Sequence, residues 1–459
     1  MKKMELKKAL VVGMARSGIA AAKLLVFRGA TAVVNDTKAW EQFEGGLKEL
    51  EVPGVEFRLG EDPVPILNEG VEAVILSPGV PVSAPVVRAA REKGIPVLGE
   101  LEYAYRESCG YLAAITGTNG KTTTTTLLSE IFKNNGKRVH TVGNIGNPYS
   151  GEVPGMRPED VTVCEVSSFQ METAEQFHPN VAAVLNISED HLNRHGTMEV
   201  YISMKKRVFQ NCTGNDSVVL NYDDPETRAM LTDVKCRVVW FSTQGPVPFG
   251  AFVRDGVIVY GSENSVVPVC PAQDLKIPGR HNLANALAAT AMAMASGVPA
   301  AVVRNTLRHF EGVEHRIEFT REISGVKFWN DSKGTNVDST IQAVRAMDRP
   351  AVLIAGGYDK HTDFTPMVQE ILKSQVEKVV LIGDTAQQIA DTLDKCGFTA
   401  YEHCGYDFDF AIRRAYELAR EGGSVLLSPA CASFDMFSDY EARGREFKRI
   451  VKDLEPKQA

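Results

Sequence analysis

The chain has 459 residues and a formal net charge of -8 at pH 7, and at roughly 150 residues per domain this length suggests about three domains. The acidic balance leaves no positive field for a phosphate backbone, so we expect no nucleic-acid partner. The eight cysteines are scattered, which fits neither a zinc ribbon nor a disulfide framework and favours a reducing compartment such as the cytoplasm. No apolar stretch predicts a membrane span.

Apolar runs bounded by glycine open the chain in the alternating pattern of an α/β nucleotide-binding fold. The runs at 9–12, 31–34 and 73–76 predict strands with helical segments between them. The turn at 13–18, G-M-A-R-S-G, is not a full G-x-G-x-x-G fingerprint, which argues against a dehydrogenase and for another nucleotide ligand. Asp36 ends the second run and, taken alone, is equally typical of an ordinary turn.

The strongest signal is a glycine-rich turn between an apolar strand and a threonine-rich helix start, at residues 112–123. Backbone N–H groups of such a turn cradle phosphate oxygens, Lys121 neutralises phosphate charge, and the Thr122 hydroxyl can ligate Mg²⁺. Ile115 stands where the standard Walker pattern has glycine, so other nucleoside triphosphatases and an ordinary strand-turn-helix stay open. The residues expected to hold ATP here are Gly117, Thr118, Asn119, Gly120, Lys121, Thr122 and Thr123.

Two further predicted strands end in groups that can bind a metal ion. The run at 161–166 carries Glu165, and the run at 181–186 is followed by His191. A phosphoryl-transfer site needs hard oxygen ligands for Mg²⁺, which makes Glu165 a candidate ligand and His191 a candidate for a second ion. A solvated carboxylate and a structural histidine are the alternatives for each residue taken alone.

A third series of apolar runs, at 352–355, 379–382 and 425–428, completes the α/β pattern. The expected fold class is therefore α/β with three domains: an N-terminal Rossmann-like domain, a central P-loop ATPase-like domain and a C-terminal Rossmann-like domain. We place these domains at 1–98, 99–312 and 313–459.

The turn at 117–123, G-T-N-G-K-T-T, resembles the signature of the Mur ligase superfamily, which includes the peptidoglycan amino-acid ligases and the folylpolyglutamate synthases. The segments E-V-S-S-F-Q at 165–170, N-I-S-E-D-H-L at 186–192, G-R-H-N-L-A-N-A at 279–286 and N-D-S-K-G-T-N at 330–336 resemble further motifs of the family. The resemblance implies ATP-dependent joining of an amino acid to a carboxylate through an acyl-phosphate.

The resemblance also implies roles for individual residues. Lys205 matches a lysine that CO₂ converts to a carbamate in several members, and this anion would help to bind a second Mg²⁺; a solvated basic helix is the open alternative. The implied catalytic residues are Lys121, Glu165, His191 and Lys205, and the implied metal ligands are Thr122, Glu165, His191 and Lys205. The implied ATP contacts outside the glycine-rich turn are Asn282, Arg316, Asp331 and Lys333.

Four segments of the outer parts of the chain resemble the D-glutamate-adding group of the superfamily: N-D-T at 35–37, S-P-G at 77–79, A-G-G-Y-D-K at 355–360 and L-S-P-A-C-A-S-F-D at 427–435. In that group the first domain binds the UDP part of UDP-N-acetylmuramoyl-L-alanine, with the position of Asp36 reading uracil. The two carboxylates of D-glutamate call for cations and hydrogen-bond donors in the last domain. Lys38 and Tyr440 stand where some relatives carry arginine and phenylalanine. The implied substrate contacts are Ser17, Asp36, Thr37, Ser77, Gly79, Asn144, Ser167, Thr335, Lys360, Ser433 and Tyr440.

These resemblances imply ATP-dependent ligation of D-glutamate to UDP-N-acetylmuramoyl-L-alanine in cytoplasmic peptidoglycan precursor synthesis, with ATP and two Mg²⁺ ions. One alternative is another ligase of the superfamily, such as a folylpolyglutamate synthase, against which the UDP-type first domain argues. Another is a nonenzymatic nucleotide-binding regulator, which the phosphate and Mg²⁺ motifs disfavour. The sequence is compatible with a monomer and leaves the oligomeric state open.

Overall fold

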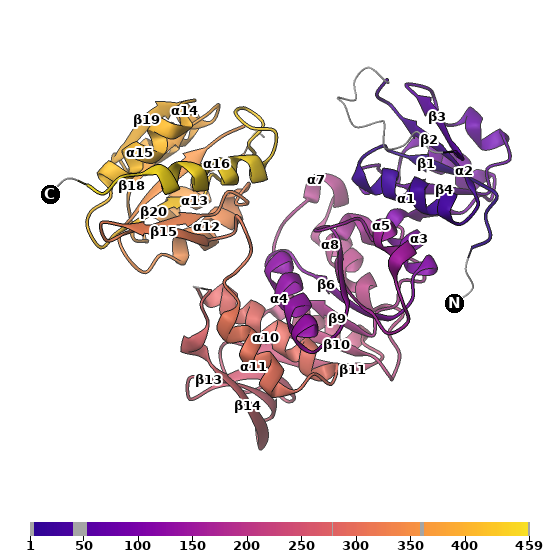
Figure 1. The fold of residues 1–459 in the computed structure, drawn as a ribbon, viewed down its shortest axis with the longest axis horizontal. Helices are drawn as coiled ribbons and strands as arrows, with labels where there is room; N and C mark the ends of the chain where they lie inside the picture. The colour runs from indigo at the N-terminus through magenta and orange to yellow at the C-terminus, as the bar shows by residue number, and fades with distance from the viewer. Residues whose placement is uncertain (1–3, 40–52, 278, 359–361, 458–459) are drawn as a thin grey trace. The chain divides into compact units, whose positions relative to one another are not determined.

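The computed structural model describes residues 4–39, 53–277, 279–358 and 362–457 (Figure 1). The chain divides into two compact units, residues 1–274 with 284–308 and residues 275–283 with 309–459. Among the described residues, no helix combines the length and the apolar character needed to cross a membrane. The domain boundaries at 98 and 312 stay a prediction.

The amino-terminal part of the first unit is a parallel five-stranded sheet in the order β3-β2-β1-β4-β5. The central strands β1 and β4 are apolar runs buried on both faces, as a parallel sheet covered by helices requires. The strand order reverses between β1 and β4, which creates a ligand-binding crevice at their carboxyl ends. The elements are β1 (Lys8–Val12), α1 (Arg16–Phe27), β2 (Thr31–Asp36), β3 (Val55–Leu59), η3 (Pro65–Asn68), β4 (Ala73–Leu76), α2 (Pro85–Glu92) and β5 (Val97–Gly99).

The central part of the first unit is a nine-stranded sheet in the order β14-β13-β12-β11-β10-β9-β6-β8-β7. The strands from β7 to β12 pair in parallel, whereas β13 and β14 are antiparallel additions at one edge. The strands are β6 (Tyr111–Thr116), β7 (Val139–Gly143), β8 (Val161–Glu165), β9 (Val181–Val184), β10 (Ser217–Asn221), β11 (Arg237–Ser242), β12 (Gly250–Arg254), β13 (Val257–Ser262) and β14 (Ser265–Pro271).

Helices and short 3-10 turns connect these strands. The helix at 280–295 is rich in alanine because it is buried, and its residues 286 to 289 have no exposed surface. The helical elements are α3 (Glu100–Glu107), α4 (Lys121–Asn134), α5 (Tyr149–Glu152), η4 (Val153–Gly155), α6 (Ser168–Met171), α7 (Leu192–His195), α8 (Met198–Lys206), η5 (Arg207–Phe209), α9 (Pro225–Ala229), η6 (Met230–Asp233), η7 (Ala272–Asp274), α10 (Arg280–Ala295) and α11 (Ala300–His309).

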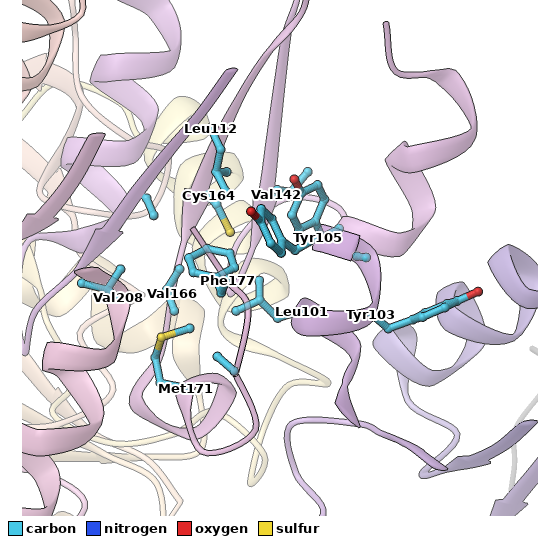
Figure 2. Close-up of a cluster of buried hydrophobic side chains, with 14 of the residues drawn as sticks. Leu101, Tyr103, Tyr105, Leu112, Val142, Cys164, Val166, Met171, Phe177 and Val208 are labelled. Carbon is cyan, nitrogen blue, oxygen red and sulfur yellow. The ribbon is translucent and has the colours of Figure 1, made fainter. Parts of the chain in front are cut away.

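One continuous cluster of buried apolar side chains runs from the first sheet through α3 to the central sheet. Figure 2 shows its middle, where side chains of α3 approach those of the central sheet. The rings of Tyr105 and Phe177 meet edge to face with centroids 5.3 Å apart. Cys164 and Val166, which flank Glu165, both belong to this cluster. The core therefore fixes the end of β8 from which the Glu165 carboxylate projects.

The second unit is built on a six-stranded sheet in the order β15-β16-β20-β17-β18-β19, in which only the β15–β16 pair is antiparallel. Two separate buried clusters cover its two faces. The elements are β15 (Glu318–Ile323), β16 (Val326–Asn330), α12 (Val337–Arg345), β17 (Ala351–Gly356), α13 (Thr365–Ile371), β18 (Val376–Ile382), α14 (Ala386–Lys395), β19 (Tyr401–Gly405), α15 (Phe408–Leu418), β20 (Ser424–Leu427) and α16 (Tyr440–Asp453).

Candidate active site

The glycine-rich turn joins β6 to the first turn of α4, and its two glycines are required by close neighbours. Gly117 has φ +152°, and a Cβ placed on it would lie 2.9 Å from the Leu185 Cβ. Gly120 has φ +85°, and a Cβ there would lie 2.2 Å from the Asn285 Oδ1. Only glycine fits both positions without displacing its surroundings. The backbone N–H groups at the start of α4 are thus held in the arrangement that binds phosphate.

Polar contacts fasten the turn to the segment that follows β9. The Asn119 backbone N–H donates to Asn186 Oδ1 at 2.8 Å, and Asn186 Nδ2 donates back to the Asn119 carbonyl at 3.0 Å. The Thr118 hydroxyl accepts from the Ser188 N–H at 3.0 Å and hydrogen-bonds with the Tyr201 hydroxyl at 3.1 Å. Because these partners come from two other segments, the turn is rigid before any ligand binds.

Lys121 and Lys205 converge on one acceptor. Lys121 Nζ donates to the Gly117 carbonyl at 2.9 Å and to the Thr118 carbonyl at 2.7 Å, and Lys205 Nζ donates to the same Gly117 carbonyl at 2.7 Å. Only 2% of the Lys205 surface is exposed. Burial first, and the charge of Lys121 second, hold the pKa of Lys205 well below its ordinary value. A neutral amine is therefore accessible at this position.

Glu165 is a buried carboxylate with one oxygen in use. Its Oε1 accepts from Asn144 Nδ2 at 2.8 Å, and the Asn144 N–H donates to the Glu165 carbonyl at 2.9 Å. Within the described residues, Oε2 is buried and has no hydrogen-bond partner. A buried carboxylate oxygen without a donor is costly unless a cation satisfies it. Glu165 is thus suited to bind a metal ion, with Asn144 orienting it.

His191 begins α7 in the left-handed conformation, with φ +54°. Its ring lies 4.7 Å from the Phe169 ring, measured between centroids, and its Nε2 lies 3.4 Å from an Asp190 carboxylate oxygen. Partial burial lowers the pKa of His191; the Asp190 charge opposes this shift, and the charges of Lys121 and Lys205 add to it. A lowered pKa favours the neutral imidazole, the form in which a histidine binds a metal ion.

Three further residues that we predict to contact ligands lie at the amino-terminal ends of helices, namely Thr122, Thr123 and Ser167. Thr122 and Thr123 are buried in the first turn of α4. Ser167 is the N-cap of α6, where its hydroxyl accepts from the Gln170 N–H and the Gln170 side chain accepts from the Ser167 N–H. The Ser167 hydroxyl also donates to Gln170 Oε1 at 3.0 Å. This serine holds α6 in place beside the end of β8.

The residues predicted to contact UDP surround the carboxyl ends of β1, β2 and β4. The Asp36 carboxylate accepts from the Met14 N–H at 2.7 Å and the Lys38 N–H at 3.0 Å. The Ser77 hydroxyl donates to the Gly13 carbonyl at 2.8 Å. The Asp36 carboxylate therefore links two turns through hydrogen bonds, in addition to any contact with a ligand. Three more predicted contacts lie on the adjoining turns and the first turn of α1, namely Ser17, Thr37 and Gly79.

In the second unit, Asp331 follows β16 and is buried. Its Oδ2 accepts from the Ser428 hydroxyl at 2.6 Å, and its Oδ1 accepts from the Ile317 N–H at 3.2 Å. Burial raises the pKa of Asp331 to about 7, and the Ser428 hydrogen bond and the Arg316 charge oppose this rise. Asp331 thus titrates near neutral pH, far above an ordinary aspartate.

The remaining predicted contacts of the second unit belong to loops that one buried arginine joins. Arg443 is fully buried in α16 and donates to the Ser332 carbonyl at 2.9 Å, the Cys431 carbonyl at 3.1 Å and the Ala432 carbonyl at 3.2 Å. The Lys333 amine lies 5.5 Å from the centre of the Tyr440 ring. The predicted contacts on or beside these loops are Lys333, Thr335, Ser433 and Tyr440. Lys360 lies outside the described residues.

Sequence reasoning missed several residues that shape the site. Asn285, whose Oδ1 lies against Gly120, follows the predicted ATP contact Asn282 by three residues, or about one helical turn. Tyr201 precedes Lys205 by four residues on α8, and the Lys205 amine lies 4.6 Å from the centre of the Tyr201 ring. Residues three or four positions apart share one face of a helix. Asn285 and Tyr201 could therefore have been predicted from their spacing to Asn282 and Lys205.

The residues present fit Mg²⁺ bound through substrate phosphates rather than through an all-protein site. In the described part of the chain, no group of three or more His, Cys, Asp or Glu side chains is arranged to hold a metal ion. Mg²⁺ is usually bound by one or two carboxylates together with phosphate oxygens and water. The unpartnered oxygen of Glu165 and the Thr122 hydroxyl match that pattern.

Comparisons with known families cover most of the chain. Residues 7–99 match the MurD-like N-terminal domain of Mur ligases, residues 115–293 the Mur ligase middle domain, and residues 315–431 the Mur ligase glutamate ligase domain. The chain belongs to the Mur ligase family. The family expected from the sequence motifs is thereby confirmed, as is the three-domain α/β fold class.

Three full-length relatives of this Mur ligase are each named UDP-N-acetylmuramoylalanine--D-glutamate ligase. Those from Thermoanaerobacter sp. (strain X514) and Thermoanaerobacter pseudethanolicus are 46% and 47% identical over 449 residues, which is 98% of each chain. The one from Clostridioides difficile is 41% identical over 450 residues, covering 98% of this chain and 99% of the relative.

Solved structures share the fold of this Mur ligase at low identity. The UDP-N-acetylmuramate-alanine ligase of Thermotoga maritima aligns with a TM-score of 0.61 at 20% identity, covering 98% of this chain and 99% of the other. The MurF ligase of Thermotoga maritima, solved in complex with ADP, aligns with a TM-score of 0.58 at 16% identity, covering 98% and 97%. These likenesses concern the fold alone.

Proposed function

We propose that this Mur ligase joins D-glutamate to UDP-N-acetylmuramoyl-L-alanine, with ATP supplying the driving force, in peptidoglycan precursor synthesis. The observation that carries the proposal is 46% identity over 98% of both chains to a relative whose name states the two substrates. The cluster of Lys121, Glu165, His191 and Lys205 around the glycine-rich turn supports the reaction class, because phosphoryl transfer depends on positioning and on positive charge.

ATP is the nucleotide that the glycine-rich turn would bind. The N–H groups at the start of α4 would receive the phosphate oxygens, and the Lys121 amine would exchange its carbonyl acceptors for the terminal phosphates. Its present partners are neutral carbonyls, whereas a phosphate offers a stronger, charge-assisted bond. The further ATP contacts in this proposal are Gly117, Thr118, Asn119, Gly120, Thr122, Thr123, Asn282, Arg316, Asp331 and Lys333.

Thr122 and Glu165 would hold Mg²⁺ beside the phosphates, and His191 with a carbamylated Lys205 would hold a second ion. Bound Mg²⁺ supplies neutralisation of the charge that develops on the transferred phosphoryl group. The carbamate forms when a neutral Lys205 amine attacks CO₂ and releases a proton, giving a carboxylate-like anion. The lowered pKa of Lys205 supports this step, because only the neutral amine is a nucleophile.

The reaction has two bond-forming steps. An oxygen of the L-alanyl carboxylate attacks the γ-phosphorus of ATP, so that ADP leaves and an acyl-phosphate forms. The neutral amine of D-glutamate then attacks the acyl carbon, inorganic phosphate leaves, and the amine gives up a proton as the amide forms. Lys121 would stabilise negative charge in both steps, because it lies where the terminal phosphate binds.

UDP-N-acetylmuramoyl-L-alanine and D-glutamate would bind in the first and last domains. We propose the limits of these domains as 1–98 and 313–459. The crevice at the ends of β1 and β4 suits UDP, because it offers the first turn of α1 and the turn at 77–80 as donors. The nucleotide contacts proposed there are Ser17, Asp36, Thr37, Ser77 and Gly79, and those nearer the chemistry are Asn144 and Ser167. The D-glutamate contacts proposed are Thr335, Lys360, Ser433 and Tyr440.

The direct test measures phosphate release from ATP with Mg²⁺ and UDP-N-acetylmuramoyl-L-alanine, comparing D-glutamate with L-glutamate, D-alanine and diaminopimelate. We expect release with D-glutamate alone, and loss of that release in Lys121→Ala with an unchanged circular dichroism spectrum. Release only with another amino acid would overturn the D-glutamate assignment. No release under any of these conditions would favour the nonenzymatic regulator, and release that needs no amino acid would contradict ligation. We also propose a cytoplasmic location, because the scattered cysteines suit a reducing compartment.

A further inference from the structure

We propose that Arg194 is a positioning residue that aligns the UDP-linked substrate with the phosphate site; the inference rests on the function proposed above. Arg194 lies on α7 in the first unit, three residues after His191. It contacts the turn that follows β4 on one side and the ring that supports His191 on the other. None of its contacts was foreseen from a motif.

Arg194 is anchored by a paired ionic contact. Its Nε donates to Glu172 Oε1 at 3.0 Å and its Nη2 donates to Glu172 Oε2 at 2.7 Å. The two side chains are 18% and 9% exposed, so the pair is shielded from water. A two-pronged arginine–carboxylate contact fixes the guanidinium plane as well as its position. Glu172 ends α6, and its carbonyl also accepts from Arg207 at 3.1 Å.

The guanidinium reaches from this anchor to the first sheet. Arg194 Nη2 also donates to the Val80 carbonyl at 3.3 Å. The Val80 N–H donates in turn to the Ser77 carbonyl at 3.0 Å, and the Ser77 hydroxyl donates to the Gly13 carbonyl at 2.8 Å. Ser77, Val80, Phe169 and Arg194 line one small cavity between the two sheets. Arg194 thus holds the turn that we propose to bind the UDP-linked substrate.

The same guanidinium packs against Phe169, whose ring lies beside the proposed metal ligand His191. Its carbon lies 4.6 Å from the centre of the Phe169 ring, and the His191 and His195 rings lie 4.7 and 5.5 Å from that ring. The His195 ring lies 5.5 Å from the Tyr201 ring, which the Lys205 amine approaches at 4.6 Å. A chain of direct contacts therefore joins the turn at 77–80 to the residues around the phosphates.

Arginine is required here by geometry rather than by charge alone. A lysine amine could pair with Glu172 but could not make two parallel bonds, reach Val80 and stack on Phe169 together. We therefore expect Arg194→Lys to fold and to let the turn at 77–80 shift relative to the phosphate site. A shift of this kind weakens the binding of the UDP-linked substrate and lowers the rate, because the reacting oxygen is misplaced.

The test compares Arg194→Lys with wild type and with Arg228→Lys. Arg228 is a matched control in the same unit, since its guanidinium also faces an aromatic ring, at 5.7 Å from Tyr222, and donates to a carbonyl at 3.0 Å. We expect Arg194→Lys to raise the KM for UDP-N-acetylmuramoyl-L-alanine about tenfold and to lower kcat by about tenfold. The KM for D-glutamate and all constants of Arg228→Lys should stay within about twofold. An unchanged KM for the UDP-linked substrate, with or without a lower kcat, overturns the inference.

Calorimetric titration with UDP-N-acetylmuramoyl-L-alanine separates this inference from the proposed reaction. We expect Arg194→Lys to bind about tenfold more weakly than wild type even if no amino acid supports ligation. Equal affinities overturn the positioning role while leaving the proposed reaction intact. Failure of the wild type to bind the UDP-linked compound overturns both. Glu172→Gln should weaken binding in the same direction, and the double variant should add little further loss, because the two side chains act as one unit.

Discussion

Lys121 and Lys205 donate to the same carbonyl oxygen, that of Gly117, at 2.9 and 2.7 Å. Burial, and next the charge of Lys121, lower the pKa of Lys205. Lys121 begins α4, where we propose that the phosphates of ATP bind. The arrangement places the amines of a buried lysine and a helix-start lysine on one carbonyl oxygen.

The first prediction concerns Lys205 and its neighbour Lys206. Lys205→Arg should reduce kcat by at least about a hundredfold, because a guanidinium cannot become a carbamate and stays charged. Lys206→Arg is the control, since Lys206 is 33% exposed and pairs with Asp233 at 2.7 Å. It should keep nearly full activity. Steady-state kinetics together with carbon-13 NMR of protein exposed to labelled CO₂ would test both parts. Full activity of Lys205→Arg would contradict the assignment.

The second prediction tests whether steric collision, rather than backbone strain, prevents residue 120 from carrying a side chain. Gly120→Ala should abolish nucleotide binding, because the new Cβ would lie 2.2 Å from Asn285 Oδ1. Gly136→Ala is matched in backbone conformation, with φ +76° against +85°, but has no atom within 4 Å of the new Cβ. It should cost only about 1 kcal/mol of stability and leave binding intact. Fluorescence titration with a labelled ATP analogue would decide, and equal affinities for both variants would refute the steric argument.

The third prediction tests the unpartnered oxygen of Glu165. Glu165→Gln keeps the shape and still accepts from Asn144 but removes the negative charge. We expect kcat to fall by about a hundredfold or more and the Mg²⁺ concentration for half-maximal rate to rise. Glu130→Gln, at an exposed position of α4 beside Lys133, serves as the control and should behave as wild type. An unchanged Mg²⁺ requirement in Glu165→Gln would show that this carboxylate does not bind the ion.

The fourth prediction follows from the pKa of Asp331, raised to about 7 by burial. An unfolded aspartate titrates near 3.9, so between roughly pH 4 and pH 7 the native state binds more protons than the unfolded state. This contribution to stability is complete below about pH 4 and is lost as pH rises through about 7. Asp331→Asn lacks this titration and should gain stability relative to wild type by a few kcal/mol across that window.

Thermal unfolding of the ligand-free protein at several pH values from about 5 to 8 checks this prediction. The Tm of Asp331→Asn minus the Tm of wild type should increase steadily as pH rises. Curves that run parallel at all pH values would mean that Asp331 is already ionised in the native protein at low pH.

Much of the fold, and the candidate phosphate-binding turn, could be predicted from short segments of the sequence. Apolar runs between glycines predict buried parallel strands because such strands have no solvent face, and the structure contains β1, β6 and β17 where those runs lie. Lys121 and Glu165 could be proposed as site residues because Lys121 begins the helix that follows the turn after β6, and Glu165 ends β8. The carboxyl ends of parallel strands lie at one sheet edge. Elements and candidate residues that depend only on a few neighbouring positions can therefore be predicted from the sequence.

Contacts between residues far apart in the chain could not be predicted from the sequence. Arg194 meets Val80, which precedes it by 114 residues, and nothing in the spacing of either residue indicates their contact. Asp36 was predicted as a ligand contact, yet its carboxylate is also held by two backbone N–H groups from neighbouring turns. Such partners arise from how the sheets are assembled, which periodicity along the chain does not encode.

The most direct measurement uses UDP-N-acetylmuramoyl-L-alanine labelled with oxygen-18 in its L-alanyl carboxylate, incubated with ATP, Mg²⁺ and D-glutamate. If the carboxylate attacks the γ-phosphorus and the amine then displaces phosphate, one labelled oxygen passes into each released phosphate, and the other stays in the new amide. Mass spectrometry should find singly labelled phosphate in equal amount to the D-glutamyl product. Unlabelled phosphate, or phosphate formed without that product, would contradict the proposed ligation through an acyl-phosphate.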